Sequence, residues 1–88
     1  MSDGNNKLTE KDLESVSGGI ITPEEAYAAA LEHAGLAKDQ IQLVKKIELD
    51  FEHGRRIYEV EFYHNGLEYE YDIDAKSGKI MKFEKGWD

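Results

Sequence analysis

The sequence predicts an α+β fold, in which one N-terminal helix packs on one face of a four-stranded antiparallel β-meander. Three observations support this expectation. A clearly marked helix start at Thr22 is followed by small apolar residues at helical spacing. Beyond Gly35 the hydrophobic period changes to two, as in half-buried strands. Asn65-Gly66 is the dipeptide most typical of a two-residue hairpin turn.

The helix has both a start and a stop signal. Thr22 can cap its N-terminus, Pro23 suits its first turn, and Glu24 and Glu25 lie at the positive end of the helix dipole. Gly35 is expected to end it, because glycine readily adopts the left-handed conformation of a C-cap. The buried stripe is expected to contain Ala26, Ala29, Ala30, His33 and Ala34.

The turn at Asn65-Gly66 sets the register of the central hairpin. With a two-residue loop His64 pairs with Leu67, and every second residue then points to the helix side. The core face of the two central strands is expected to contain Tyr58, Val60, Phe62, Tyr69, Tyr71 and Ile73.

The outer strands are less regular. The first strand carries Lys45 as a charged residue on its otherwise apolar face, which is expected to contain Ile41, Leu43, Ile47, Leu49 and Phe51. In the last strand a bulged turn at Gly78 is expected to bury Met81 and Phe83 rather than Ile80.

The face opposite the helix is expected to be acidic. If Gly54-Arg55 is a two-residue turn, Glu48 faces Glu61 and Asp50 faces Glu59, so that like charges lie in rows across the strands. The candidate partner-binding residues of this face are Glu48, Asp50, Glu59, Glu61, Glu68, Glu70 and Asp72.

Two interpretations of this acidic face remain open. It can be an ordinary solvated sheet face, on which Lys46, Lys79 and Lys82 relieve the repulsion. Alternatively, it can bind Lys or Arg side chains, or hard cations such as calcium, through its carboxylate oxygens.

Composition excludes several classes of function. The 88 residues suffice for one small domain, and the net charge of -8 opposes binding to nucleic acid or to anionic membranes. No apolar run approaches the roughly 20 residues of a membrane span. Without cysteine there is no disulfide, thiolate site or cysteine nucleophile. His33, His53 and His64 lack metal-ligand spacing. We expect no enzymatic activity, no catalytic residue, no cofactor and no dedicated metal site.

The chain divides at two glycines. Residues 1–19 are polar and too poor in apolar groups to build a core, so this segment is expected to be flexible and mostly disordered. Within it, Leu8, Leu13 and Val16 would share one face of a short helix that ends at Gly18-Gly19. Residues 20–88 are expected to form the folded domain.

The folded segment resembles a PepSY domain from Ile21 to Glu84. The similarity rests on Thr22-Pro23-Glu24-Glu25-Ala26, Ala34-Gly35-Leu36, the strand 58–62 and the segment 69–80. PepSY domains occur in propeptides of thermolysin-type metallopeptidases and as free extracellular modules. The resemblance therefore implies inhibition or regulation of an extracellular peptidase, and it supplies no catalytic residues.

The N-terminal segment resembles a double-glycine leader of bacterial peptides exported by ABC transporters with a leader-cleaving peptidase domain. The matching positions are Leu8, Thr9, Asp12, Leu13, Val16, Gly18 and Gly19, with Asp12 where Glu is commoner. The resemblance implies recognition through Leu8, Leu13 and Val16 and cleavage at Gly18-Gly19-Ile20. The protein would be cytoplasmic before export and secreted or at the cell surface after leader removal.

The leading hypothesis is a secreted PepSY-like module that binds a peptidase by steric occlusion. A second hypothesis is an exported protein of the immunity type that binds cations or cationic peptides and has no peptidase target. A bacteriocin-like exported peptide fits the leader but not the acidic charge, because membrane-active peptides are usually basic amphipaths.

Overall fold

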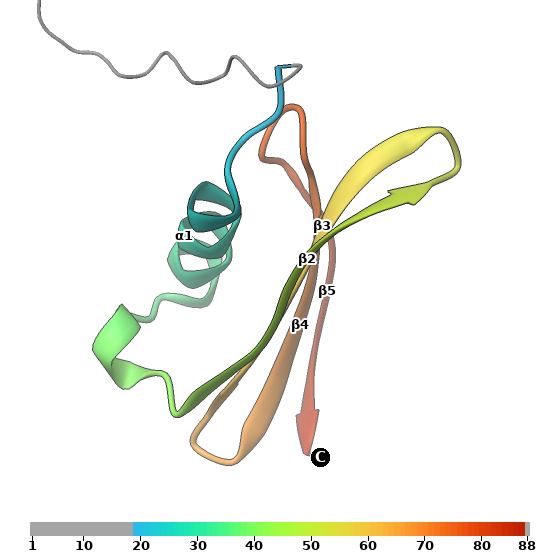
Figure 1. The fold of residues 1–88 in the computed structure, drawn as a ribbon. Coiled ribbons are helices and arrows are strands. Elements are labelled where there is room, and N and C mark those ends of the chain that lie inside the picture. Colours follow the sequence, from blue (N-terminus) through green and yellow to red (C-terminus); the bar gives the residue numbers. More distant parts are fainter. Residues whose placement is uncertain (1–18, 88) are drawn as a thin grey trace, which may run out of the picture.

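One α-helix lies across one face of a four-stranded antiparallel sheet in the computed structural model, which describes residues 19–87 (Figure 1). The helix α1 spans Pro23–Ala34, and a short 3-10 turn follows at Lys38–Gln40. The strands are β2 (Leu43–Glu52), β3 (Arg55–His64), β4 (Leu67–Asp74) and β5 (Ile80–Trp87), and they lie side by side in that order. The predicted fold class is confirmed. The expected disorder of the leader falls on residues outside the described ones.

Local signals place the helix ends where the sequence predicts them. The Thr22 hydroxyl accepts a hydrogen bond from the Glu25 N–H at 3.1 Å, and the Glu25 carboxylate accepts one from the Thr22 N–H at 2.8 Å. This reciprocal capping box satisfies two backbone donors that the helix leaves free. At the other end Gly35 has φ 74°, and the Leu36 N–H donates to the Leu31 carbonyl.

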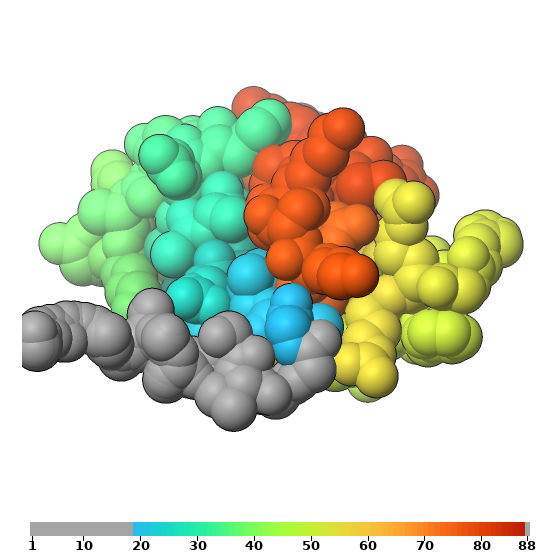
Figure 2. Space-filling view, turned by 90° about the horizontal axis from the view of Figure 1, so that it is seen from above, coloured from blue at the N-terminus to red at the C-terminus, as the bar shows by residue number. Residues whose placement is uncertain are grey.

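The chain just before the helix is fixed to the sheet. The Ile21 N–H donates to the Ala75 carbonyl at 2.7 Å, and the Tyr58 hydroxyl donates to the Ile21 carbonyl at 2.8 Å. Figure 2 shows the blue start of this segment beside the orange turn between β4 and β5. Ile21 therefore joins the start of the helix to β3 and to the turn between β4 and β5.

The core lies between the small-residue side of α1 and the two central strands. Ala26 and Ala30 are fully buried, so the helix approaches the sheet closely. Leu31, which the expected stripe did not include, is also buried. The sheet contributes the six predicted residues, all of them buried: Tyr58, Val60, Phe62, Tyr69, Tyr71 and Ile73.

The central hairpin has the predicted register. Asn65 and Gly66 both adopt positive φ, 54° and 77°, as a type I′ turn requires. His64 pairs with Leu67 and Phe62 with Tyr69, whose rings stack with centroids 5.1 Å apart.

The hairpin between β2 and β3 turns one residue earlier than predicted. The left-handed residues are His53 and Gly54, so Glu52 pairs with Arg55. The expected pairings of Glu48 with Glu61 and of Asp50 with Glu59 are therefore wrong. Glu48 faces Glu59, Asp50 faces Ile57, and Lys46 faces Glu61. The hairpin projects beyond the helix (Figure 1).

A bulge in β2 also corrects the expected position of Lys45. The register shifts between Val44 and Lys46, so Lys45 is the additional residue and reaches the acidic face instead of the apolar one. The same shift moves Leu43 opposite Tyr63, where it is 59% exposed, and places Val44 opposite Phe62.

The last strand contains a second bulge that the sequence did not locate. Ile73 pairs with Ile80 and Asp72 with Lys82, which leaves Met81 as the additional residue. Ile80 is half-buried against the core, whereas Met81 is 42% exposed, so the preference for a buried Met81 is wrong. Phe83 stacks on Tyr71 with ring centroids 4.7 Å apart but remains 38% exposed.

Val60 offers a direct test of this core. Val60→Asp places a carboxylate at a fully buried position, at a cost of several kcal/mol that approaches the stability of a small domain. We expect loss of the cooperative thermal transition, measured by circular dichroism. Leu43→Asp is the matched control, because Leu43 is largely exposed in the same sheet. A Val60→Asp variant with the wild-type melting temperature would contradict the assigned register.

Candidate functional site

The acidic face lies on the side of the sheet opposite α1. Because Glu59 and Glu61 alternate with the buried Tyr58, Val60 and Phe62, their carboxylates point away from the helix. The structure brings together on this side all seven candidate residues: Glu48, Asp50, Glu59, Glu61, Glu68, Glu70 and Asp72.

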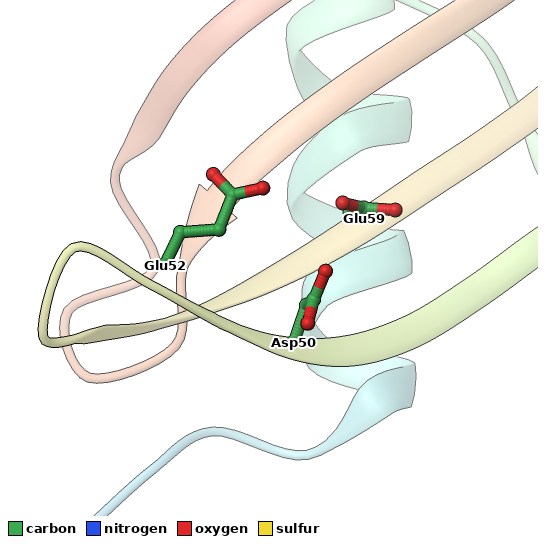
Figure 3. A group of neighbouring side chains, drawn as sticks. All are labelled: Asp50, Glu52 and Glu59. Carbon is green, nitrogen blue, oxygen red and sulfur yellow. The ribbon is translucent and has the colours of Figure 1, made fainter.

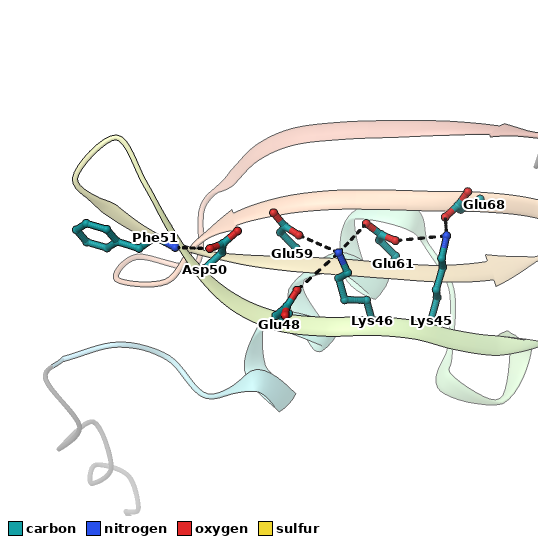
Figure 4. Close-up of polar contacts among 8 residues, drawn as sticks. All are labelled: Lys45, Lys46, Glu48, Asp50, Phe51, Glu59, Glu61 and Glu68. Atoms are coloured by element: carbon teal, nitrogen blue, oxygen red, sulfur yellow. Dashed lines mark hydrogen bonds and ion pairs between the residues drawn. The ribbon is translucent and has the colours of Figure 1, made fainter.

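Lys46 neutralises the part of this face that spans β2 and β3 (Figure 4). Its ammonium lies 3.1 Å from Glu59, 3.6 Å from Glu48 and 3.8 Å from Glu61. These carboxylates raise the pKa of Lys46, with the hydrogen bond from Glu59 as the largest cause. The sequence predicted this relief by Lys46.

Lys45 neutralises the neighbouring part of the face. The β2 bulge directs its ammonium to Glu68 at 2.9 Å and to Glu61 at 3.8 Å (Figure 4). Glu68 is only 9% exposed, so its carboxylate needs this partner more than a solvated one would. Sequence reasoning missed this contact, because strict alternation assigns Lys45 to the other face.

Glu70 forms an ion pair with neither Lys45 nor Lys46. Its cross-strand neighbours are Glu61 on β3 and Glu84 on β5, both acidic. Partial burial raises the pKa of Glu70 first, and the charges of Glu68 and Glu61 raise it further. Among residues 19–87, no basic side chain forms an ion pair with Glu70.

Two groups of three carboxylates are spaced closely enough to share a cation. One contains Asp50, Glu52 and Glu59 near the turn of the β2–β3 hairpin (Figure 3), with oxygens within 4.8 Å of one another. Glu52 joins this group because the turn comes one residue early, and sequence reasoning missed it.

The second group contains Glu61, Glu68 and Glu70. Here Lys45 already contacts Glu61 and Glu68, so a cation would compete with an ammonium group. The first group is therefore the better candidate for a hard cation such as calcium.

The leader residues fall mostly outside the described part of the chain. Leu8, Leu13, Val16 and Gly18 cannot be placed. Gly19 is exposed with φ 75°, and Ile20 packs partly against the core. Ile20, directly after the expected cleavage position, thus already contacts the folded domain.

Residues 20–84 match the family model PepSY, described as peptidase propeptide and YPEB domain. The chain belongs to the PepSY family. The match covers nearly all of the helix and sheet described above, in agreement with the resemblance noted from the sequence. The description is that of a propeptide domain, which is a regulatory rather than a catalytic kind of module.

The chain is also similar to two other proteins. The uncharacterized protein Spy1430 of Streptococcus pyogenes serotype M6 is 34% identical over 62 residues, which cover 70% of this chain and 47% of that protein. A crystal structure described as "a putative lipoprotein" from Clostridium difficile 630 aligns with a TM-score of 0.62 and 29% identity. That alignment covers 91% of this chain and 53% of the other. This PepSY chain therefore spans about half the length of both proteins.

In the described PepSY domain, no helix is long and apolar enough to cross a membrane.

The raised pKa of Glu70 predicts a pH-dependent stability difference. The folded state holds the Glu70 proton more tightly than the unfolded state, where the ordinary value is 4.5. The stability that Glu70 contributes is therefore full below this value and is lost as the pH rises through the raised pKa. We expect Glu70→Gln to melt at a higher temperature than wild type at neutral pH, with the difference disappearing in acid.

Glu48→Gln is the control for this measurement. It removes the same charge, but Glu48 is 61% exposed and Lys46 contacts both it and the opposing Glu59, so little repulsion is relieved and only a small change in melting temperature is expected. Equal melting temperatures for wild type and Glu70→Gln at neutral pH would show that the ionised Glu70 carboxylate does not destabilise the folded state.

Proposed function

We propose that this PepSY domain is an exported binding module that regulates an extracellular peptidase by covering part of its surface. The observation that carries the proposal is the family match over residues 20–84, whose description names a peptidase propeptide domain. The similarity to a protein described as "a putative lipoprotein" supports a location outside the cytoplasm.

The shape and charge of the domain fit a binding role. The sheet presents an acidic face on one side and two edge strands, β2 and β5, that can contact a partner. The net charge of -8 favours a partner with a basic surface and speeds encounter with it. Inhibition would then result from steric occlusion and would need no covalent chemistry.

A second candidate function is the binding of cations or cationic peptides without a peptidase target. The group formed by Asp50, Glu52 and Glu59 favours it, because three carboxylates within 4.8 Å offer oxygen ligands of the kind that calcium prefers. Calcium that raises the melting temperature of the chain, but not that of Asp50→Asn, would favour this alternative.

Export through a double-glycine leader is part of the proposal. It is supported by Gly18-Gly19 directly before Ile20, where contacts with the core begin. Ile21 is already hydrogen-bonded to Ala75 and Tyr58. Cleavage after Gly19 would therefore release a domain that keeps its first tertiary contacts.

The peptidase proposal is tested by inhibition. The full chain and a fragment of residues 20–88 should both inhibit at least one metallopeptidase secreted by the source organism. Glu59→Lys, Glu61→Lys and Glu70→Lys should weaken inhibition about tenfold or more if the acidic face is the contact.

Glu32→Lys is the matched control, because Glu32 is an exposed residue of α1 on the other side of the sheet. Unchanged inhibition by the three variants would move the contact to an edge strand or a loop. Failure of the wild-type chain on every secreted peptidase would refute the proposed function.

The leader proposal is tested by cleavage. A double-glycine leader peptidase should cut between Gly19 and Ile20, because residues without β-carbons fit an extended backbone into a narrow channel. Gly18→Val should block cutting by steric exclusion. Leu13→Asp should weaken docking by a few kcal/mol, because it places a charge in an apolar groove.

The products are measured by mass spectrometry, with a known double-glycine substrate as the positive control. Survival of the intact chain while that substrate is cut would remove the case for export by this route.

A further inference from the structure

Strand β5 is an edge of the sheet that the helix leaves largely open. α1 packs on β2, β3 and β4, and it reaches β5 through the contact between the His33 and Phe83 rings. Phe83 is 38% exposed and Trp87 is 79% exposed (Figure 1 shows the strand at the side of the sheet). An open strand edge beside exposed aromatic rings is suited to pairing with another strand.

The acidic side of β5 contains a shallow depression of about 410 Å³. Gly86 pairs with Glu68 and has no side chain, which leaves space above that carboxylate. Trp87 lies at one end of the depression. Its lining residues are Glu68, Glu70, Glu84, Lys85, Gly86 and Trp87.

The charges around this depression are not balanced within the described domain. Lys45 forms an ion pair with Glu68. Glu70 lies between Glu61 and Glu84 and has no basic partner among residues 19–87. Lys85 is turned toward the other side, where its ammonium lies 5.5 Å from the centre of the Tyr69 ring. A cation from outside would relieve the repulsion on Glu70.

We propose that the segment Lys82–Trp87 of β5 receives an extended basic segment of a partner protein as an additional strand. An arginine of that segment would enter the depression and pair with Glu70 and Glu84. The next side chain of the partner would point to the opposite side, against Phe83. This contact rests on the proposed binding role and names the chemistry of its partner.

Arginine fits this depression better than the alternatives. Its planar guanidinium forms paired hydrogen bonds with carboxylates, and the depression offers those of Glu70 and Glu84. A second copy of the chain is disfavoured, because two molecules of charge -8 repel each other. The other edge, β2, is interrupted by the bulge at Lys45, whereas the β4–β5 register is regular from Lys82 to Trp87.

Trp87 makes the contact directly measurable, because it is the chain's only tryptophan. The full chain is titrated with a short peptide of alternating Arg and Val, and Trp87 fluorescence is recorded. We expect a saturable change, and Glu70→Gln should weaken binding about tenfold, as for loss of a charged hydrogen-bonded partner. Glu32→Gln, which removes the same charge from an exposed position of α1 on the other side of the sheet, should leave binding unchanged.

Two further measurements separate strand pairing from simple charge attraction. The same peptide with a central proline cannot complete the backbone pairing and should bind far more weakly. Gly86→Leu fills the depression at a position where a β-carbon meets nothing within 4 Å, so it should abolish binding without lowering the melting temperature. Equal binding of both peptides, equal effects of Glu70→Gln and Glu32→Gln, or full binding by Gly86→Leu would each overturn the inference.

The outcome is distinguishable from that of the peptidase assay. A chain that inhibits a peptidase but does not bind the Arg-Val peptide refutes the β5 contact and leaves the proposed function intact. A chain that binds the peptide as described but inhibits no peptidase retains the β5 contact and loses the peptidase role.

Discussion

The register of the β3–β4 hairpin is the constraint on which the rest of the structure depends. The left-handed pair Asn65 and Gly66 fixes it, and each following cross-strand pair inherits it. Because side chains alternate, this register places the aromatic core on one side and the carboxylates of Glu59, Glu61 and Glu70 on the other. A slip by one residue would exchange the two sides, burying charges and exposing rings.

Features with local causes could be predicted from the sequence. The capping box of Thr22 and Glu25, the stop at Gly35 and the turn at Asn65-Gly66 each involve residues a few positions apart. The turn between β2 and β3 was misplaced because it uses His53 at φ 52°. A non-glycine residue adopts that conformation less often, and only the pairing of the whole hairpin decides in its favour.

The two bulges could not be predicted, since their positions depend on contacts distant in sequence. Lys45 leaves the strand alternation to reach Glu68, 23 residues away. Met81 also leaves the strand alternation, because Ile73 pairs with Ile80 while Asp72 pairs with Lys82. The composition of the acidic face followed from period-two alternation, but its neutralisation by Lys45 and the depression beside Trp87 depend on these bulges. The sequence therefore indicated the residues of the face but not their distribution of charge.

The attachment of Ile21 has a mechanical consequence. Ile21 is held by its hydrogen bonds to Ala75 and Tyr58, whereas the helix behind it contacts the sheet through buried apolar side chains and one hydrogen bond, between His33 and Tyr71. Tension applied at the N-terminal end therefore loads two hydrogen bonds first and then peels α1 away one turn at a time. The strands of the sheet are bonded along their whole length and resist together. The domain is thus weak toward traction from its N-terminus, and the first product of such traction is a bare sheet with its aromatic side exposed.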